Sequence, residues 1–195
     1  MYRLTPRMLQ RMKGDLGKYH DLFDSNRCSG WELEELIVNA VKSDTQAQHH
    51  VRWQEAGHDD KADILVRTNG ARHSIQIKSG QMRAGKLILS GHRLGRFDGD
   101  LRRITDYLNA PSANIIAVPY RQTNDETGRR HLYRVCYVDK TVIAGIDPAA
   151  WRPHGKQHRQ TNASGVEFSL RPSMSWQIWW SIPLDQIEST DEFAA

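Results

Sequence analysis

The chain has 195 residues, of which 38% are hydrophobic and 26% are charged; this is enough for one folded domain with a real core. No run approaches the roughly 18 apolar residues of a membrane span, and the N-terminus lacks a secretory signal, so we expect a cytoplasmic protein without membrane contact. The two cysteines, Cys28 and Cys136, exclude a disulfide framework and a four-cysteine zinc site, and we expect reduced thiols.

Local patterns predict alternating helices and strands along the chain. Residues 1–27 are basic with a helical pattern, and 31–41 carries apolar residues at helical spacing. Further along, the patterns predict strands at 48–54, 62–67, 73–78, 114–120 and 131–138, and a helix at 96–109. We therefore expect an α/β fold in which helices flank a mixed β-sheet.

Positive charge is concentrated in the middle of the chain. The net charge is only +4, but between residues 67 and 134 there are 13 Lys and Arg against 5 Asp and Glu. Arginines among Ser, Gln and Asn suit phosphate contact, because a guanidinium forks onto phosphate oxygens. The same charges can also form a solvated face, so composition alone leaves nucleic acid and solvent as two open interpretations.

Asn69-Gly70 separates two short apolar runs and is a strong hairpin signal, because both residues tolerate the positive φ of a tight turn. If they form a two-residue turn, opposing residue numbers sum to 139 and Asp63 lies directly across from Gln76. Lys78 points to the same face, being two residues beyond Gln76. We therefore expect an acid, an amide and a lysine together at the open end of the hairpin; an exposed ion pair is the simpler alternative.

The helix predicted at 31–41 places one carboxylate differently from the others. At about 100° per residue, Glu34 falls at the edge of the apolar stripe. A carboxylate there is costly unless a cation or a hydrogen bond satisfies it. Glu34 is therefore a candidate metal ligand, or else a border residue that reaches out to water. The apolar stripe consists of Leu33, Leu36, Ile37, Ala40 and Val41. The solvated side of the helix consists of Glu32, Glu35, Asn39 and Lys42.

Three segments carry a family resemblance: Ser29-Gly-Trp-Glu-Leu-Glu-Glu-Leu-Ile-Val, Lys61-Ala-Asp-Ile-Leu-Val and Ser74-Ile-Gln-Ile-Lys-Ser-Gly. Together they resemble the restriction-endonuclease-like nucleases, which are named for a PD-(D/E)xK motif. The nearest variant is the Asp…Gln-x-Lys form of Mrr-type restriction nucleases, in which a helix with a glutamate precedes two strands. The resemblance covers about residues 29–80 and implies a catalytic site of Glu34, Asp63, Gln76 and Lys78.

The resemblance implies magnesium-dependent chemistry, and Mg²⁺ prefers oxygen ligands. It makes Asp63 the central metal ligand, joined by Glu34 and the backbone carbonyl of Ile77. Gln76 would add an oxygen or orient a water, and Lys78 would sit over the attacking water. The commoner family pattern has an acid where Gln76 stands, so Glu34 would have to supply the missing negative charge.

Polar and basic side chains after Lys78 are candidates for contact with DNA phosphates, and for each a solvent-facing charge is the alternative. Residues able to read base edges concentrate in 121–130 and 151–162. The candidate DNA contacts are Ser79, Gln81, Arg83, Lys86, Arg93, Arg96, Arg102, Arg103 and Arg121.

Other candidate sites fit less well. His154 and His158 are four residues apart, but a proline and a glycine around them disfavour the helix that a zinc site of this spacing needs. Asp59 and Asp60 are rivals of Asp63, yet neither begins an apolar strand. No glycine-rich phosphate loop is present, so no nucleotide cofactor is expected.

We expect a single nuclease domain over residues 1–195, with a catalytic core at about 29–140 and recognition or dimerisation elements at 141–195. The expected function is that of a type II restriction endonuclease that cuts double-stranded DNA with Mg²⁺. A homodimer is expected, because two active sites must meet the two strands of a symmetric target. The alternatives are a structure-specific nuclease of the same fold, acting on junctions or in repair, and a DNA-binding module without catalysis.

Overall fold

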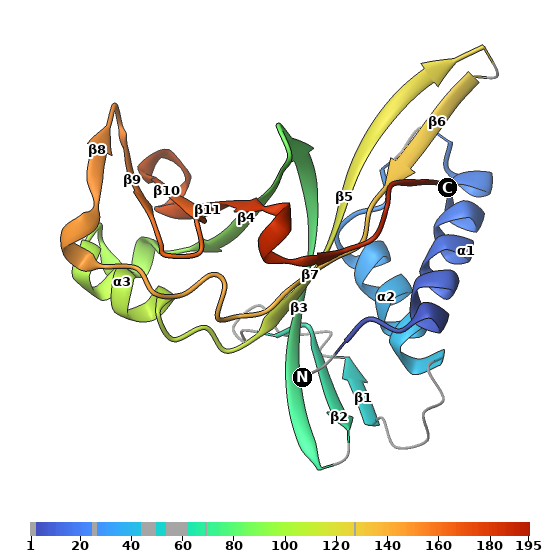
Figure 1. The fold of residues 1–195 in the computed structure, drawn as a ribbon, viewed down its shortest axis with the longest axis horizontal. Coiled ribbons are helices and arrows are strands. Elements are labelled where there is room, and N and C mark those ends of the chain that lie inside the picture. The colour runs from blue at the N-terminus through green and yellow to red at the C-terminus, as the bar shows by residue number, and fades with distance from the viewer. Residues whose placement is uncertain (1–2, 25–26, 44–49, 54–61, 69, 127) are drawn as a thin grey trace. The chain divides into compact units, whose positions relative to one another are not determined.

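The computed structural model describes residues 3–24, 27–43, 50–53, 62–68, 70–126 and 128–195 (Figure 1). Contacts divide the chain into two compact units, each built from segments far apart in the sequence. Unit 1 comprises Met1–Ser79, Ser112–Tyr137 and Ser189–Ala195, and unit 2 comprises Gly80–Pro111 and Val138–Glu188. The single domain expected from the sequence, with a core at about 29–140, stays a prediction.

The two helices of unit 1 begin where their flanking residues predict. α1 (Pro6–Leu22) starts behind Thr5, whose hydroxyl accepts a hydrogen bond from the amide of Met8 at 3.3 Å, and a proline fills the first turn. α2 (Trp31–Ser43) follows Gly30, whose φ of +60° lies in the region that favours glycine. The helices expected early in the chain are therefore confirmed. None of the helices in the described ranges is long and apolar enough to cross a membrane.

The strands of unit 1 join two hairpins through one parallel pair. β1, β2 and β3 pair antiparallel in that order, and β5 lies beside β3 and runs in the same direction (Figure 1). β5 also pairs with β6 and β7, and β13 pairs with β6. These strands are β1 (His50–Trp53), β2 (Ile64–Thr68), β3 (Ala71–Arg83), β5 (Asn114–Asp125), β6 (Gly128–Tyr133), β7 (Cys136–Val138) and β13 (Phe193–Ala194).

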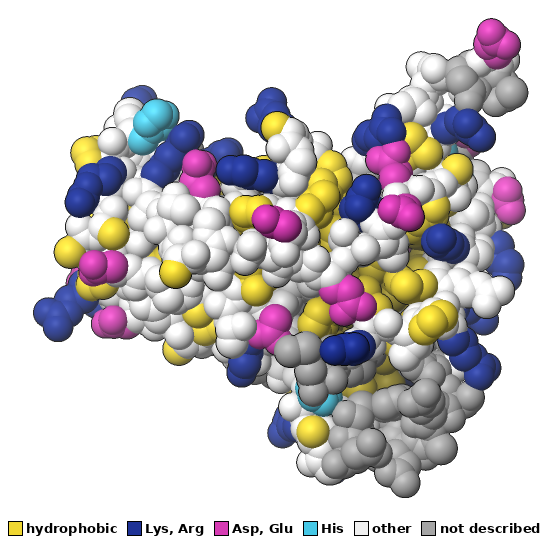
Figure 2. All heavy atoms as spheres, viewed as in Figure 1, with side chains coloured by type: hydrophobic (Ala, Val, Ile, Leu, Met, Phe, Trp, Pro, Cys, Tyr) yellow, Lys and Arg dark blue, Asp and Glu magenta, His cyan; other side chains and the backbone are white. Residues whose placement is uncertain are grey.

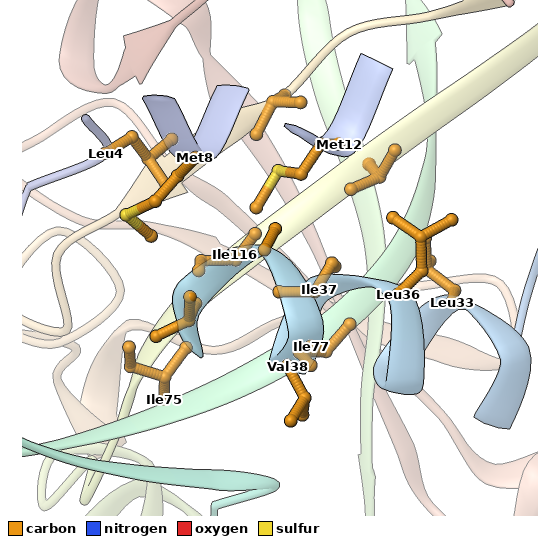
Figure 3. Close-up of a cluster of buried hydrophobic side chains, with 14 of the residues drawn as sticks. Leu4, Met8, Met12, Leu33, Leu36, Ile37, Val38, Ile75, Ile77 and Ile116 are labelled. Carbon is orange, nitrogen blue, oxygen red and sulfur yellow. The ribbon is translucent and has the colours of Figure 1, made fainter. Parts of the chain in front are cut away.

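The core of unit 1 lies between the two helices and one face of the sheet. Figure 3 shows Ile37 and Val38 of α2 together with Ile75 and Ile77 of β3 in one cluster of buried side chains. Burying a side chain of this size contributes about 1.5–3 kcal/mol. This packing holds α2 against the strand that carries Gln76 and Lys78. Further members of the cluster are Leu4, Met8, Met12, Leu16, Leu33, Leu36, Ala40, Val41, Ile64, Val66, Ile116, Val118 and Tyr133.

Unit 2 is largely a run of antiparallel strands, which the sequence did not predict. Beyond unit 1, the end of β3 pairs with β4, and the order continues β4-β11-β10-β9-β8. The elements are β4 (Lys86–Arg93), η1 (Gly95–Phe97), α3 (Leu101–Leu108), η2 (Pro148–Ala150), β8 (Arg152–His154), β9 (Gln157–Thr161), β10 (Glu167–Arg171), η3 (Pro172–Met174), β11 (Gln177–Pro183) and η4 (Leu184–Gln186). The short strand β12 (Glu188–Ser189) falls where unit 2 returns to unit 1.

The helix expected at 96–109 is shorter than predicted. α3 (Leu101–Leu108) begins behind Asp100, whose carboxylate accepts hydrogen bonds from two amides of the first turn at 3.0 and 3.1 Å. Before it, Asp98 and Gly99 have φ of +47° and +76°. A right-handed helix cannot continue through residues in the left-handed conformation. The helix therefore begins after Gly99 and not at residue 96.

The strand expected at 131–138 is wrong as a single strand, because the chain divides it into β6 and β7. The break falls at Val135, whose amide donates to the hydroxyl of Thr190 at 3.1 Å. The strands expected at 62–67, 73–78 and 114–120 are confirmed as β2, β3 and β5, and β3 and β5 run further than predicted. Of the strand expected at 48–54, residues 50–53 form β1, and the remainder lies outside the described residues.

Both cysteines are free thiols in the core of unit 1. Burial raises the pKa of Cys28 to about 11 and that of Cys136 to about 12. Thiols with such pKa values are poor nucleophiles at neutral pH.

Taken together, the described residues form a mixed α/β fold with three helices and a mixed sheet, as the sequence predicts.

Candidate active site

The hairpin of β2 and β3 has the register that the sequence predicts. Thr68 pairs with Ala71 and Ile64 with Ile75, so opposing residue numbers sum to 139. Gly70 has φ of +80°, and Asn69 lies outside the described residues. The alternation of the strands therefore follows the prediction, with one face in the core and the other facing outward. The core face carries Ile64, Val66, Ile75 and Ile77, and the outer face carries Leu65, Arg67, Arg72, Ser74, Gln76 and Lys78.

Asp63 departs from the ladder in a way that the sequence did not predict. The regular pairs end at Ile64, and Asp63 does not pair directly with Gln76. Its amide donates to the carbonyl of Ile75 at 2.9 Å, and its carboxylate Oδ2 accepts from the amide of Ile77 at 2.6 Å. Asp63 therefore forms hydrogen bonds with Ile75 and Ile77, the residues directly before and after Gln76. Because N–H and C=O of an extended residue point to the same side, the carbonyl of Ile77 also faces Asp63.

The charges of two carboxylates act on Lys78. Burial lowers its pKa, and the charges of Asp63 and Glu34 act on it in the opposite direction. Burying an ammonium disfavours its charged form, whereas a carboxylate within about 4–6 Å favours it. The two acids whose charges act on Lys78 are therefore the acid of the hairpin and the acid of α2, the same residues that the sequence groups as a candidate site. Glu34 and Asp63 each make further interactions within the chain.

Glu34 occupies the border position predicted for it on α2. Its side chain is half-buried, whereas Glu32 and Glu35 are exposed. The amide of Glu34 donates to the carbonyl of Gly30 at 3.1 Å, so the residue belongs to the first turn of the helix. The first turn tolerates a carboxylate well, because the helix dipole is positive at this end.

Gln76 is buried, with only 8% of its surface exposed. Its amide offers one oxygen acceptor and two N–H donors, so it provides an oxygen without a negative charge. The candidate donors for a cation are therefore the carboxylates of Asp63 and Glu34, the amide oxygen of Gln76 and the main-chain carbonyl of Ile77.

This donor set fits a hard cation such as Mg²⁺, which takes oxygen ligands and keeps several waters. It contains no thiolate or imidazole, the ligands that select zinc. Within the described ranges, no three or more His, Cys, Asp or Glu side chains gather as a metal site. The rivals considered from the sequence, Asp59 and Asp60, lie outside the described residues.

The predicted DNA contacts fall into both units. In unit 1, the hydroxyl of Ser79 accepts a hydrogen bond from Arg27 at 3.2 Å, and Arg121 forms a forked ion pair with Glu192. A phosphate contact by Arg121 would therefore require it to exchange partners. The contacts predicted in unit 2 are Gln81, Arg83, Lys86, Arg93, Arg96, Arg102 and Arg103.

Some of the predicted phosphate contacts already serve the protein itself. The guanidinium of Arg96 lies 4.5 Å from the ring centre of Tyr107, and that of Arg103 lies 5.4 Å from the ring of Phe97. Such cation–π contacts occupy the face of the guanidinium and leave its edge able to donate. In Figure 2, Lys and Arg side chains appear at many separate places on the face shown, with Asp and Glu between them.

The pair of histidines at 154 and 158 forms no helical zinc motif. His154 ends β8 and His158 lies in β9, so the two sit on neighbouring strands of a hairpin. This agrees with the prediction that the proline and glycine around them exclude a helix.

The sequence missed four arginines of unit 1. Arg27 contacts Ser79, and Arg52, Arg67 and Arg72 lie on β1, β2 and β3. For two of them the signal was present, because the sum of 139 already pairs Arg67 with Arg72. The sequence could not predict the partner of Arg52, because the connection between β1 and β2 is too long to determine which residues of the two strands pair.

No protein-family model matches the chain, and neither a curated protein nor a solved structure is detectably similar to it.

Proposed function

We propose that this chain is a Mg²⁺-dependent endonuclease that hydrolyses phosphodiester bonds of double-stranded DNA, as a type II restriction enzyme acting as a homodimer does. The observation that supports it most is the environment of Lys78, a half-buried lysine on the same strand as the buried Gln76, on whose pKa the charges of both Asp63 and Glu34 act. Two acids and a lysine around a strand that also carries a buried amide are the groups that phosphodiester hydrolysis uses. The resemblance of residues 29–80 to PD-(D/E)xK nucleases adds support.

Hydrolysis joins a water oxygen to phosphorus, breaks the P–O bond to the leaving sugar oxygen and returns a proton to that oxygen. Mg²⁺, when bound, would supply Lewis acidity to the phosphate and lower the pKa of a bound water. Asp63 and Glu34 would hold the cation, with the oxygens of Gln76 and Ile77 as neutral partners. Lys78 would donate hydrogen bonds to the attacking water or a phosphate oxygen, which balances the negative charge that builds up there.

The test is digestion of methylated and unmethylated phage DNA by the purified chain, with Mg²⁺ or with EDTA. The site variants are Asp63→Asn, Glu34→Gln and Lys78→Met. Matched controls are Glu35→Gln and Lys42→Met, which change exposed residues of α2. We expect discrete fragments that require Mg²⁺, a rate loss of about 10²–10³-fold or more in the site variants, and wild-type rates in the controls.

A DNA-binding module without catalysis is the second candidate, and the buried Gln76 favours it. An amide in place of an acid removes one negative charge from the metal site. Intact DNA under every condition, together with a retarded band in a gel-shift assay, would establish this function and exclude the nuclease. A Gln76→Glu variant that cleaved DNA under these conditions would identify the amide as the cause.

A further inference from the structure

A small open pocket lies on the outer face of the β1–β2–β3 meander, within unit 1. Its volume is about 280 Å³, and the described side chains that line it are Arg52, Leu65, Arg67 and Arg72. Three of the four are cations, and no acidic residue of the described ranges lines the pocket. Such a lining suits an anion small enough to enter, and a phosphate group has this size and charge.

The strand register explains why the three arginines gather. Arg67 is directly opposite Arg72, and Arg52 is opposite Leu65. Directly opposed residues of antiparallel strands have Cβ atoms about 4.5–5.5 Å apart and share one face. Two like charges in such positions destabilise the sheet, and a third on the neighbouring strand adds to the repulsion. A bound anion would remove this cost.

Some other arginines of the described ranges form ion pairs within the chain. Arg11 pairs with Asp15, Arg121 with Glu192, and Arg159 with Glu167 at 3.8 Å. In the part of the chain that is described, Arg52, Arg67 and Arg72 have no such ion pair, and all three are exposed. The fold thus leaves their guanidinium forks available to a ligand from solution, and a guanidinium fork fits the oxygens of a phosphate.

The pocket shares its face of the sheet with the candidate active site. Arg67 lies four residues from Asp63 along the chain, and Arg72 lies four residues from Gln76 along β3. At about 3.3 Å per residue, this separation is about 13 Å. One strand of a duplex advances about 3.4 Å along the axis per nucleotide, so the separation corresponds to about four nucleotides.

We propose that Arg52, Arg67 and Arg72 form a pocket for a backbone phosphate of DNA, a few nucleotides from the phosphate held at Asp63 and Lys78. This inference rests on the proposed function, since it takes DNA as the substrate of the same sheet face. The pocket positions the duplex and reads no base, because phosphate contacts carry no sequence information directly.

The test measures the affinity of the full chain for a fluorescently labelled duplex of about 25 base pairs, by anisotropy, with Ca²⁺ in place of Mg²⁺ and at several salt concentrations. The pocket variants are Arg67→Gln/Arg72→Gln and the single variant Arg52→Gln. Arg67→Lys/Arg72→Lys keeps the charge but removes the forks. The matched control is Arg3→Gln/Lys18→Gln, which removes two exposed charges elsewhere in unit 1.

We expect Arg67→Gln/Arg72→Gln to weaken binding by at least about tenfold, because the variant loses two charge-assisted guanidinium–phosphate contacts. The slope of log affinity against log salt should fall by about 0.9 for each phosphate that the variant no longer neutralises. Arg52→Gln should shift both quantities in the same direction, the lysine variant should lose less affinity, and the control should match the wild type.

The outcomes separate the pocket from the proposed function. If the wild-type chain binds and cuts DNA but the glutamine variants keep its affinity and salt slope, the pocket inference is wrong and the nuclease stands. If the control loses as much affinity as the pocket variants, the effect is one of net charge and the inference is again wrong. If the wild-type chain binds no duplex, the inference fails together with the proposed function.

Discussion

The carboxylate of Asp63 accepts a hydrogen bond from the backbone amide of Ile77 at 2.6 Å, across the last step of the β2–β3 hairpin. A side chain thus takes the place of a main-chain acceptor where the ladder of paired residues stops. One oxygen of the carboxylate is thereby tied to a rigid strand, which orients the group for a ligand. The orientation of the Asp63 carboxylate is consequently determined by the backbone of β3.

Replacing Asp63 by alanine should destabilise the protein, whereas asparagine should not. Alanine leaves the amide of Ile77 without its acceptor in a partly buried place, which costs about 1–3 kcal/mol in free energy of unfolding. Asparagine retains an oxygen in the same position but lacks the charge, so it should keep stability and lose cleavage. Urea unfolding of both variants measures the difference.

The matched control for this prediction is Asp139→Ala. The carboxylate of Asp139 accepts from the amide of Thr141 at 2.9 Å, but in an exposed place where water can replace it. We expect a smaller loss of stability than for Asp63→Ala. Equal losses at the two positions would show that the hydrogen bond to Ile77 has no special role.

Glu34→Gln should raise the Mg²⁺ concentration needed for half-maximal cleavage by about 10–100-fold, because it removes one of the two carboxylates beside Lys78. The variant should remain folded, since the side chain is only half-buried and glutamine has nearly the same shape. A titration of cleavage rate against Mg²⁺ provides the measurement, with Glu35→Gln as its control. An unchanged Mg²⁺ requirement would mean that Glu34 holds no cation.

The parts of the site that the sequence predicted are those set by short-range geometry. A two-residue turn fixes the register of its hairpin, so the faces of Gln76 and Lys78 followed from counting. The apolar stripe of α2 likewise fixed the border position of Glu34. In both cases the rule needs only residues close together in the chain.

The remaining features depend on contacts between distant segments or on single unusual backbone angles. The hydrogen bond from Val135 to Thr190 divides a strand that reads as continuous, and the left-handed Asp98 interrupts a helical pattern. Arg52 joined the pocket only because β1 pairs with β2 in one of several registers that the chain allows. The strands of unit 2 pair over long separations and carry weak local signals, so the sequence did not reveal them.

Stability should fall as the pH drops below about 6.5, because His20 is buried in unit 1. Its ring stacks on that of His131 with centroids 3.6 Å apart, and its Nε2 lies 2.8 Å from the hydroxyl of Tyr133. Burial and then the neighbouring His131 lower the pKa of His20, against the opposing effects of the Phe23 backbone and Asp24. The folded state therefore keeps this ring neutral where the unfolded chain binds a proton.

The sign follows from proton linkage. A group with a lowered pKa in the folded state binds fewer protons there, so its contribution is fully present above pH 6.5 and declines as the pH falls below it. Urea unfolding at pH 7.5, 6.5 and 5.5 should show a decline in the wild type and a shallower one in His20→Gln. The exposed His154→Gln should behave like the wild type; a decline of equal slope in all three proteins would contradict the prediction.

Two glycines should respond to alanine in opposite directions. A Cβ at Gly91 in β4 would lie 2.5 Å from the ring of Trp180 and 2.6 Å from Ile178, so Gly91→Ala forces a buried tryptophan to move and should cost at least about 1–3 kcal/mol. A Cβ at Gly14 in α1 meets nothing within 4 Å, so Gly14→Ala should stabilise the protein by about 0.5–1 kcal/mol through helix propensity. Thermal unfolding of both variants beside the wild type measures the two shifts. A loss of stability confined to Gly91→Ala would show that the close packing lies between β4 and β11, since α1 belongs to the other unit. A gain of stability in both variants would instead show that β4 has room for a methyl group.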